Sequence, residues 1–258
     1  MPVDLAHEES GSGVPVVLLH AFPLYRAMFA AQVSGLADRA RVVVPDLCGF
    51  GDSPGPGDRE PSVDAMADDV ASLLRRLEVG PAVVAGVSMG GYVAMAMLRH
   101  HPQQVGAVVL VDTKAGADDE AARDNRERTA TAVVESGSRA LRPMLDNLLG
   151  QTTRTERPDV VATVTGWLDA ARPDGVAWAQ RAMAGRPSSF GTLAGTQVPA
   201  LILVGEEDTL TPHDDALAMA AAFQRPAPVR VVPRAGHLSP VENPDAVTGA
   251  LRDLLGHF

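Results

Sequence analysis

The chain has 258 residues, of which 46% are hydrophobic and 21% are charged, as is usual for a globular protein with a sizeable core. Its formal net charge of −10 disfavours nucleic acid and anionic membrane surfaces as partners. The single cysteine, Cys48, excludes an intramolecular disulfide framework and a cysteine-based metal site. The start of the chain has no basic segment followed by an apolar one, and no apolar run approaches about 18 residues. We therefore expect no signal peptide, no membrane span and a cytoplasmic location.

Short apolar runs without alternation recur along the chain, which is the pattern of strands buried on both faces of a parallel sheet. They are Val16–Leu19, Arg41–Pro45, Ala82–Ala85, Val105–Val111, Pro199–Val204 and Val229–Val232. Helical patterns separate these runs: Arg26–Leu36, a helix that Ser62 caps, a stretch from Tyr92 to Leu98, Pro212–Phe223, and a final helix with Asn243 as its N-cap. Strands that alternate with helices predict an α/β fold with a doubly wound, mostly parallel sheet.

The pattern changes between residues 114 and 194. Strand-like runs disappear there, and several helical segments follow one another, separated by glycine and proline. We interpret this segment as a helical cap inserted into a core that comprises residues 1–113 and 195–258. The cap carries Met144, Trp167, Trp178 and Met183. These four side chains either line a pocket beneath the cap or pack the cap helices together, and the sequence favours neither.

Six residues, Gly86-Val87-Ser88-Met89-Gly90-Gly91, stand between a predicted strand and a predicted helix. In that context Gly-x-Ser-x-Gly is the signature of a nucleophile elbow. The sharp strand-to-helix turn leaves no room for side chains at Gly86 and Gly90, and it exposes the Ser88 hydroxyl at its tip. The helix that follows offers unpaired N–H groups and the positive end of its dipole. The pattern predicts that Ser88 is a nucleophile.

A serine nucleophile needs a base, and the base needs a third group to orient it. Of the seven histidines, His237 lies in a loop directly after a predicted strand, beside a glycine that lets the loop bend, and we expect it to be the base. Two aspartates that end predicted strands are candidates for the acid. We prefer Asp208, in a turn-rich loop, to Asp112, which follows the strand after the elbow helix. Either carboxylate could instead accept hydrogen bonds from turn N–H groups.

With Ser88, Asp208 and His237 in this order, the whole chain resembles a capped member of the α/β-hydrolase fold superfamily. The segment His20-Ala21-Phe22-Pro23 resembles the family's His-Gly-x-Pro loop, with alanine in place of the usual glycine. This resemblance implies that the backbone N–H groups of Phe22 and Met89 form an oxyanion hole.

Two other segments of this resemblance are interpreted as structural. Asp46–Ser53 is similar to the family's Asp-x-x-Gly-x-Gly-x-Ser loop, which we expect to serve the fold, with Cys48 as a small apolar filler. His20 is expected to hold its own loop by hydrogen bonds. The charged side chains of Arg123–Arg128, Glu206 and Glu207 are interpreted as solvated.

Serine at the elbow favours acyl transfer over the chemistry of family members that carry aspartate there. Gly-x-Ser-Met-Gly-Gly and His237-Leu238-Ser239 look most like carboxylesterases and the 3-oxoadipate enol-lactonase group. The resemblance implies a serine hydrolase without cofactor or metal that cleaves a small carboxylic ester or lactone through an acyl-enzyme on Ser88. The alternatives are a carbon–carbon bond hydrolase of the meta-cleavage-product type, a lyase or peroxidase-like use of the same site, and a slow-turnover ligand receptor.

Overall fold

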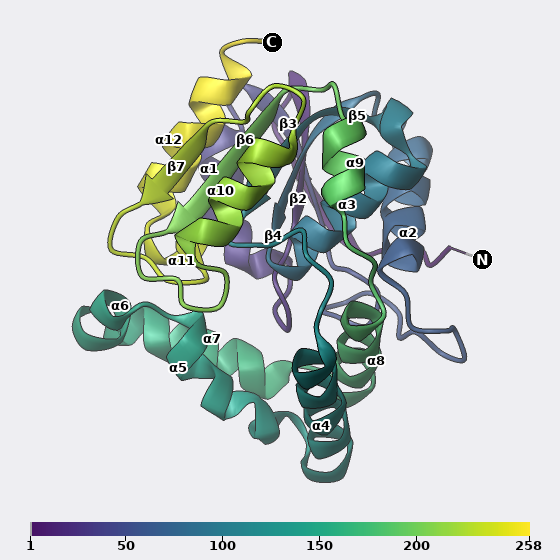
Figure 1. The fold of residues 1–258 in the computed structure, drawn as a ribbon, viewed down its shortest axis with the longest axis vertical. Coiled ribbons are helices and arrows are strands. Elements are labelled where there is room, and N and C mark those ends of the chain that lie inside the picture. The colour runs from purple at the N-terminus through teal and green to yellow at the C-terminus, as the bar shows by residue number, and fades with distance from the viewer. Residues whose placement is uncertain (1) are drawn as a thin grey trace.

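A computed structural model describes residues 2–258 (Figure 1). Within this range seven strands form one sheet in the order β1-β3-β2-β4-β5-β6-β7, and every pairing is parallel except that of β1 with β3. The strands are β1 (His7–Ser10), β2 (Val14–Leu19), β3 (Ala40–Pro45), β4 (Ala82–Val87), β5 (Val105–Val111), β6 (Ala200–Gly205) and β7 (Val229–Val232). The α/β class and the mostly parallel sheet predicted from the sequence are confirmed.

The edge strand β1 is missing from the sequence prediction. Its residues, His-Glu-Glu-Ser, are polar and either partly buried or exposed, so no apolar run marks them. Backbone pairing holds the strand in place, with His7 opposite Pro45 and Ser10 opposite Val42 of β3. An exposed ion pair between Glu9 and Arg41 at 3.0 Å reinforces the same edge. Such a strand is recognised from its partner rather than from its own composition.

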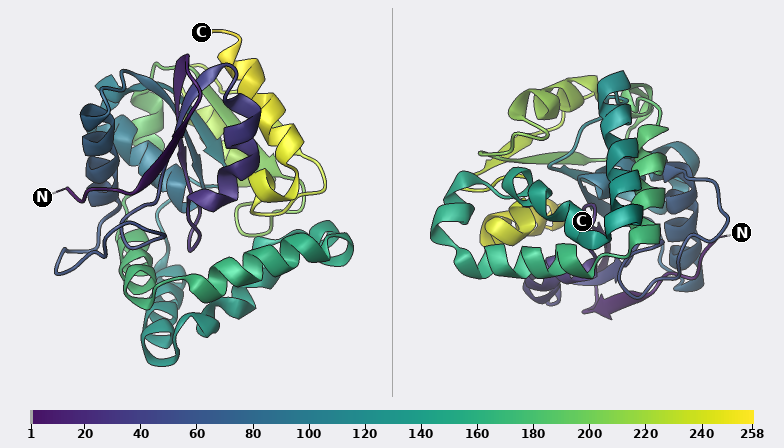
Figure 2. Two further views of the ribbon diagram at one scale, coloured as in Figure 1. Left: turned by 180° about the vertical axis from the view of Figure 1, so that it is seen from behind. Right: turned by 90° about the horizontal axis from the view of Figure 1, so that it is seen from below.

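Helices cover both faces of the sheet (Figure 2). α1 and α12 contact each other on one face, while α2 packs on α3 and α9 packs on both α3 and α10 on the other. These helices are α1 (Ala30–Leu36), α2 (Val63–Arg76), α3 (Met89–His100), α9 (Phe190–Gly195), α10 (His213–Ala222) and α12 (Pro244–Leu255). Shorter helices complete the core: α11 (Ser239–Glu242) and two 3-10 helices, η1 (Arg26–Phe29) and η2 (Pro102–Gln104). Between these layers every residue of β4 is buried, as its apolar sequence predicts.

The two helix caps predicted from the sequence are confirmed. The Ser62 hydroxyl accepts hydrogen bonds from the N–H groups of Asp64 and Ala65, at 3.1 and 3.3 Å, and begins α2. The Asn243 side chain accepts one from Ala246 N–H at 3.3 Å, with Pro244 at the first position of α12. Both caps satisfy N–H groups that a helix start leaves without a partner.

Most of the segment from residue 114 to 194 forms a separate helical layer across one end of the sheet (Figure 1). The layer comprises α4 (Glu120–Ser136), the 3-10 helix η3 (Ser138–Met144), α5 (Leu145–Leu148), α6 (Gln151–Glu156), α7 (Pro158–Ala170) and α8 (Pro173–Ala184). Below, "the cap" means α4 to α8. α9 lies against the core helices α3 and α10, although its residues fall largely inside the predicted cap segment. None of the helices in residues 2–258 is long and apolar enough to span a bilayer.

Candidate active site

A strained turn holds Ser88 between β4 and α3. Its backbone has φ +52° and ψ −111°, which places a residue with a side chain in the region that favours glycine. Gly86 and Gly90 flank this turn at positions where the neighbouring backbone leaves no room for a side chain. A Cβ on Gly86 would lie 2.1 Å from the carbonyl oxygen of Gly90, and a Cβ on Gly90 would lie 2.1 Å from that of Leu19. Only glycine at these two positions lets α3 start so close to β2 and β4.

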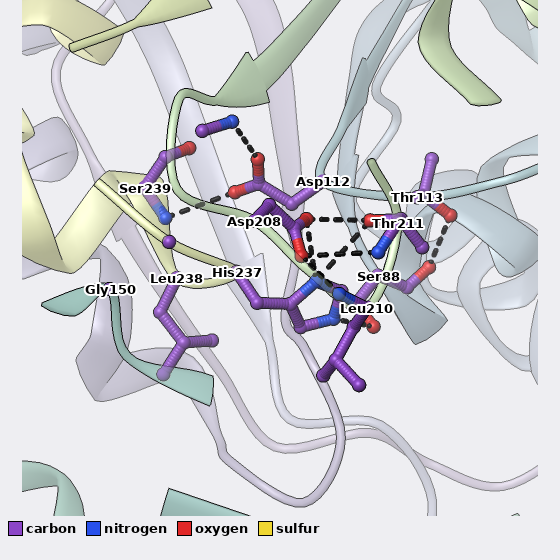
Figure 3. Close-up of polar contacts among 12 residues, drawn as sticks. Ser88, Asp112, Thr113, Gly150, Asp208, Leu210, Thr211, His237, Leu238 and Ser239 are labelled. Atoms are coloured by element: carbon purple, nitrogen blue, oxygen red, sulfur yellow. Dashed lines mark hydrogen bonds and ion pairs between the residues drawn. The ribbon is translucent and has the colours of Figure 1, made fainter. Parts of the chain in front are cut away.

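Ser88, His237 and Asp208 form a continuous row of hydrogen-bonded side chains (Figure 3). The Ser88 hydroxyl lies 2.8 Å from Nε2 of His237, and Nδ1 of His237 lies 2.9 Å from Oδ2 of Asp208. His237 comes from the loop after β7 and Asp208 from the loop after β6. Because the carboxyl ends of neighbouring parallel strands meet at one sheet edge, residues 149 positions apart in sequence reach each other.

The Asp208 carboxylate is fixed by groups of its own loop. Oδ1 accepts hydrogen bonds from the N–H groups of Leu210 and Thr211, at 2.8 and 3.1 Å. Oδ2 accepts one from the Thr211 hydroxyl at 2.7 Å, in addition to its contact with His237. Burial raises the pKa of Asp208, but these hydrogen bonds and the charge of His237 outweigh it and bring the pKa below its usual value. Asp208 is therefore ionised when it faces the imidazole.

Two opposing effects set the basicity of His237, which is 4% exposed. Burial lowers its pKa, whereas the hydrogen bond and charge of Asp208, and then the charges of Asp112 and Glu242, raise it. The net result is a pKa above the usual value. Three carboxylates thus favour the imidazolium that forms when His237 takes a proton.

Asp112 lies close to the row without joining it. Its carboxylate accepts hydrogen bonds from Gly205 N–H at 2.8 Å and from Ser239 N–H at 3.0 Å, so it ties the end of β6 to the start of α11 (Figure 3). It is 1% exposed, and burial together with the charge of Asp208 raises its pKa to about 7. Asp208, rather than Asp112, contacts His237.

Both N–H groups proposed for an oxyanion hole belong to this end of the sheet. Met89 is the first residue of α3, where a helix leaves N–H groups without an internal partner. Phe22 lines the same cavity as Ser88 and His237. His20 holds the loop of Phe22 with both ring nitrogens: Nδ1 donates to Ala21 O at 3.0 Å, and Nε2 accepts from Leu47 N–H at 2.9 Å. Burial lowers the pKa of His20 to about 4, which keeps this ring neutral.

A cavity of about 260 Å³ opens onto Ser88 and His237 beneath the cap. Of the four cap side chains considered from the sequence, Met144 and Met183 line it. Trp178 does not, since its Nε1 donates to Arg59 O at 2.7 Å and its ring joins α8 to a loop of the core. Trp167 also lies elsewhere, with its ring against Tyr25 at a centroid distance of 6.1 Å. The tryptophans attach the cap to the core, and the methionines face the cavity.

Charged residues that the sequence analysis missed also line the cavity. Lys114, Asp118 and Arg126 all reach it. The Arg126 guanidinium contacts Asp118 and donates to Gln180 Oε1 at 3.1 Å, while the buried Arg186 lies 2.9 Å from Asp118. Although burial raises the pKa of Asp118, the hydrogen bonds from Arg186 and Arg126 lower it to about 2. The interpretation of Arg126 as part of a solvated helix face is wrong, because its side chain contacts Asp118 and Gln180 and lines the cavity that opens onto Ser88.

Lys114 is a further cation among the residues that line the cavity. Its Nζ lies 3.8 Å from Asp118, and the charge of Asp215 also acts on it. The cationic groups of Lys114, Arg126 and Arg186 thus share Asp118, and with Asp215 this cluster holds three cations and two carboxylates in a chain whose net charge is −10. Among residues 2–258, no group of three or more His, Cys, Asp or Glu side chains is placed to hold a metal ion.

The chain matches the family model described as the alpha/beta hydrolase fold over residues 14–244. It belongs to the α/β-hydrolase family. It is 30% identical over 231 residues to the AB hydrolase superfamily protein YisY of Bacillus subtilis, which covers 82% of this chain and 81% of the relative.

Two solved structures show the same fold over nearly the whole chain. One is a thermophilic esterase from Thermogutta terrifontis with malate bound, with a TM-score of 0.95 and 40% identity over 99% of this chain and 94% of the other. The second is the enol-lactonase from Burkholderia xenovorans LB400, with a TM-score of 0.88 and 25% identity over 98% and 96%. This α/β hydrolase therefore has both an esterase and an enol-lactonase among its structural neighbours.

Proposed function

We propose that this α/β hydrolase is a serine hydrolase that cleaves a small carboxylic ester or lactone through an acyl-enzyme on Ser88. The observation that carries the proposal is the row from Ser88 through His237 to Asp208, with contacts of 2.8 and 2.9 Å. A nucleophile within hydrogen-bond reach of a base, itself oriented by a carboxylate, is the arrangement that acyl transfer needs.

In the proposed reaction, Ser88 attacks the carbonyl carbon while Nε2 of His237 accepts its proton. The N–H groups of Phe22 and Met89 stabilise the tetrahedral oxyanion, a contribution worth about 3 kcal/mol for each donor. His237 then protonates the leaving alkoxide, and the acyl-enzyme remains on Ser88. A water molecule that gives its proton to His237 then attacks the acyl-enzyme, and the acid leaves as His237 returns that proton to the Ser88 oxygen. Asp208 keeps the proton on Nδ1 throughout and stabilises the imidazolium.

We further propose that the substrate carries an anionic group distant from the scissile bond. The cations Lys114 and Arg126 line the cavity that opens onto Ser88, and a buried guanidinium backs them at Arg186. An anion that enters this space meets positive charge at low dielectric, where the attraction is stronger than in water. The malate in the Thermogutta esterase structure is a dicarboxylate, which is the same chemical class.

The reaction class is tested by labelling with a fluorophosphonate, read as intact mass, on wild type and Ser88→Ala. One label per chain and turnover of p-nitrophenyl acetate are expected in the wild type, and both are expected to disappear in the variant. Folded wild-type protein that takes no label would rule out a reactive serine. Label and ester turnover that persist in Ser88→Ala would assign the reaction to another residue.

The anionic substrate is tested with a matched pair, monomethyl succinate and dimethyl succinate. Lys114→Gln and Arg126→Gln are each expected to reduce kcat/KM for the monoester about 10- to 100-fold, since a hydrogen bond to a charged group contributes about 1.5–3 kcal/mol. The neutral diester should change by less than about threefold. Arg123→Gln, an exposed site on the same helix, is the control. Equal losses for both esters would show that the cations serve the fold instead.

A further inference from the structure

A buried carboxylate outside the proposed row, Glu242, contacts the His237 loop on both sides of the histidine. Oε1 accepts hydrogen bonds from Gly236 N–H at 2.9 Å and from Leu238 N–H at 3.1 Å. The residue is 4% exposed and belongs to α11, which follows this loop directly. One oxygen therefore fixes the backbone immediately before and immediately after the imidazole.

The other oxygen of Glu242 reaches the cap. Oε2 accepts a hydrogen bond from Gly150 N–H at 2.7 Å, at the point where the cap chain enters α6. Gly150 and Gly236 also meet backbone to backbone, because a Cβ on Gly236 would lie 2.3 Å from the Gly150 nitrogen. The cap and the histidine loop thus touch directly, and a single carboxylate bonds to both.

A second carboxylate binds the same end of the cap without bonding to the histidine loop through its side chain. Glu207 accepts hydrogen bonds from the N–H and the hydroxyl of Thr152, the former at 2.8 Å. The interpretation of Glu207 as solvated is therefore wrong. Glu207 bonds to Thr152 in the first turn of α6 and Glu242 to Gly150 just before it, but only Glu242 has its other oxygen on the residues that flank His237. Substitutions of these two residues can therefore test the docking of the cap and the placement of the imidazole separately.

We propose that Glu242 is a positioning residue that holds His237 in register with Ser88 and makes that register depend on the docking of the cap at Gly150. The inference rests on the proposed serine-hydrolase function, since it concerns the base of that reaction. A displacement of about 1 Å in a reacting group can lower the rate about 10²-fold, so the two hydrogen bonds of Glu242 on this loop, and the one that ties it to the cap, bear directly on turnover.

The substitution Glu242→Gln breaks the link that the carboxylate makes between the histidine loop and the cap. An amide has one acceptor oxygen and one donor NH2, so it can accept from the histidine loop or from Gly150 but not from both. It also removes one of the three negative charges that face His237, the others being those of Asp208 and Asp112. Glu207→Gln is the matched control, because it changes the contacts with Thr152 next to Gly150 and leaves all three hydrogen bonds of Glu242 in place.

The experiment measures kcat and KM for p-nitrophenyl butyrate across pH, together with the titration of the His237 ring by NMR. For Glu242→Gln we expect kcat to fall about 10- to 100-fold with KM within about threefold, and the His237 titration to move to lower pH. For Glu207→Gln we expect kcat and the titration to stay at the wild-type values.

Each outcome bears on the proposal. Equal effects of the two variants, or an unmoved titration in Glu242→Gln, would overturn it and leave both residues as attachments of the cap. Should Glu242→Gln not fold, Glu242→Asp keeps the charge and shortens the reach, so kcat should fall while the titration stays near that of the wild type. The NMR titration needs no turnover, so it tests the position of Glu242 even if labelling rejects Ser88 as a nucleophile.

Discussion

The division of roles between Asp208 and Asp112 gives the most direct test of the proposed site. In Asp208→Asn, the remaining oxygen can keep the hydrogen bonds from Leu210 and Thr211 N–H, which Oδ1 now accepts. The new NH2 group then takes the place of Oδ2 and points a donor at Nδ1 of His237. The imidazole then carries its proton on Nε2, the nitrogen that faces the Ser88 hydroxyl. This nitrogen can therefore no longer accept the serine proton.

With the proton on Nε2, we expect a large loss of kcat. A triad with this substitution loses about 10⁴-fold in kcat, which corresponds to about 5.4 kcal/mol of transition-state stabilisation. Asp112→Asn removes a carboxylate that reaches His237 only through its charge, so we expect kcat to change by less than about 10-fold. Its cost appears in the fold instead, because one of the N–H groups of Gly205 and Ser239 loses its acceptor, at about 1–3 kcal/mol.

The assay is single-turnover acylation by p-nitrophenyl acetate at pH 8, with the free energy of unfolding measured by urea titration of the same samples. Asp208→Asn should fold with nearly normal stability and acylate about 10⁴-fold more slowly. Asp112→Asn should show the reverse pattern. If Asp112→Asn loses more activity than Asp208→Asn, the assignment of the acid from the 2.9 Å contact with His237 is refuted.

Further predictions concern the elbow, a helix cap and two titrations. Gly90→Ala should destabilise the fold by about 3 kcal/mol or more, because its Cβ would lie 2.1 Å from a backbone oxygen; urea unfolding measures this, and a loss below about 1 kcal/mol would contradict the packing. Ser62→Ala should cost about 1 kcal/mol and lower Tm by about 2–4 °C, whereas Ser62→Asp should keep the Tm of the wild type. The raised pKa of His237 should place the acid limb of kcat/KM above pH 6.5, with activity falling as the base is protonated; a limb below pH 6.5 in a stopped-flow pH series would contradict this. The pKa of Asp112 is about 7 in the fold against a usual 3.8, so the folded state binds its proton more tightly and the free energy of unfolding should fall as pH rises between these values. That slope should be absent from urea titrations of Asp112→Asn.

The parts of the molecule that could be predicted from sequence are those in which the local pattern determines the structure. β4, Ser88 and α3 follow from a strand-like run, a glycine-flanked serine and a helical stretch, all within 20 residues of chain. His237 could be selected because a parallel sheet brings loops after neighbouring strands to one edge. The same rule brings both Asp208 and Asp112 to that edge, and the turn-rich loop of Asp208 favours it, but neither observation says which carboxylate turns toward the imidazole.

The parts that could not be predicted depend on contacts between distant segments. Whether Trp178 lines the cavity or bonds to Arg59 is decided by the rotation of α8, which no pattern within α8 specifies. Arg126 lies in a helix that is polar almost all round, so its inward direction is set by Asp118 and Gln180. Edge strand β1 has the same limitation, because its residues are polar and its place is set by pairing with β3 rather than by a pattern of its own.

The attachment of the cap explains why these distant contacts matter for the site. At one end, Gly175 of α8 lies so close to the core that a Cβ there would stand 2.0 Å from the carbonyl oxygen of Gly49. At the other end, Gly150 meets Gly236 in the same way, next to His237. Backbone contacts of this kind leave no room to slide without loss of packing. Side chains between the two attachments, such as Arg126 and Met144, face the cavity and bear no such contact. Substitutions at these positions can therefore change the substrate preference while His237 stays in place. The cap thus contacts the substrate through one set of residues and supports His237 through another.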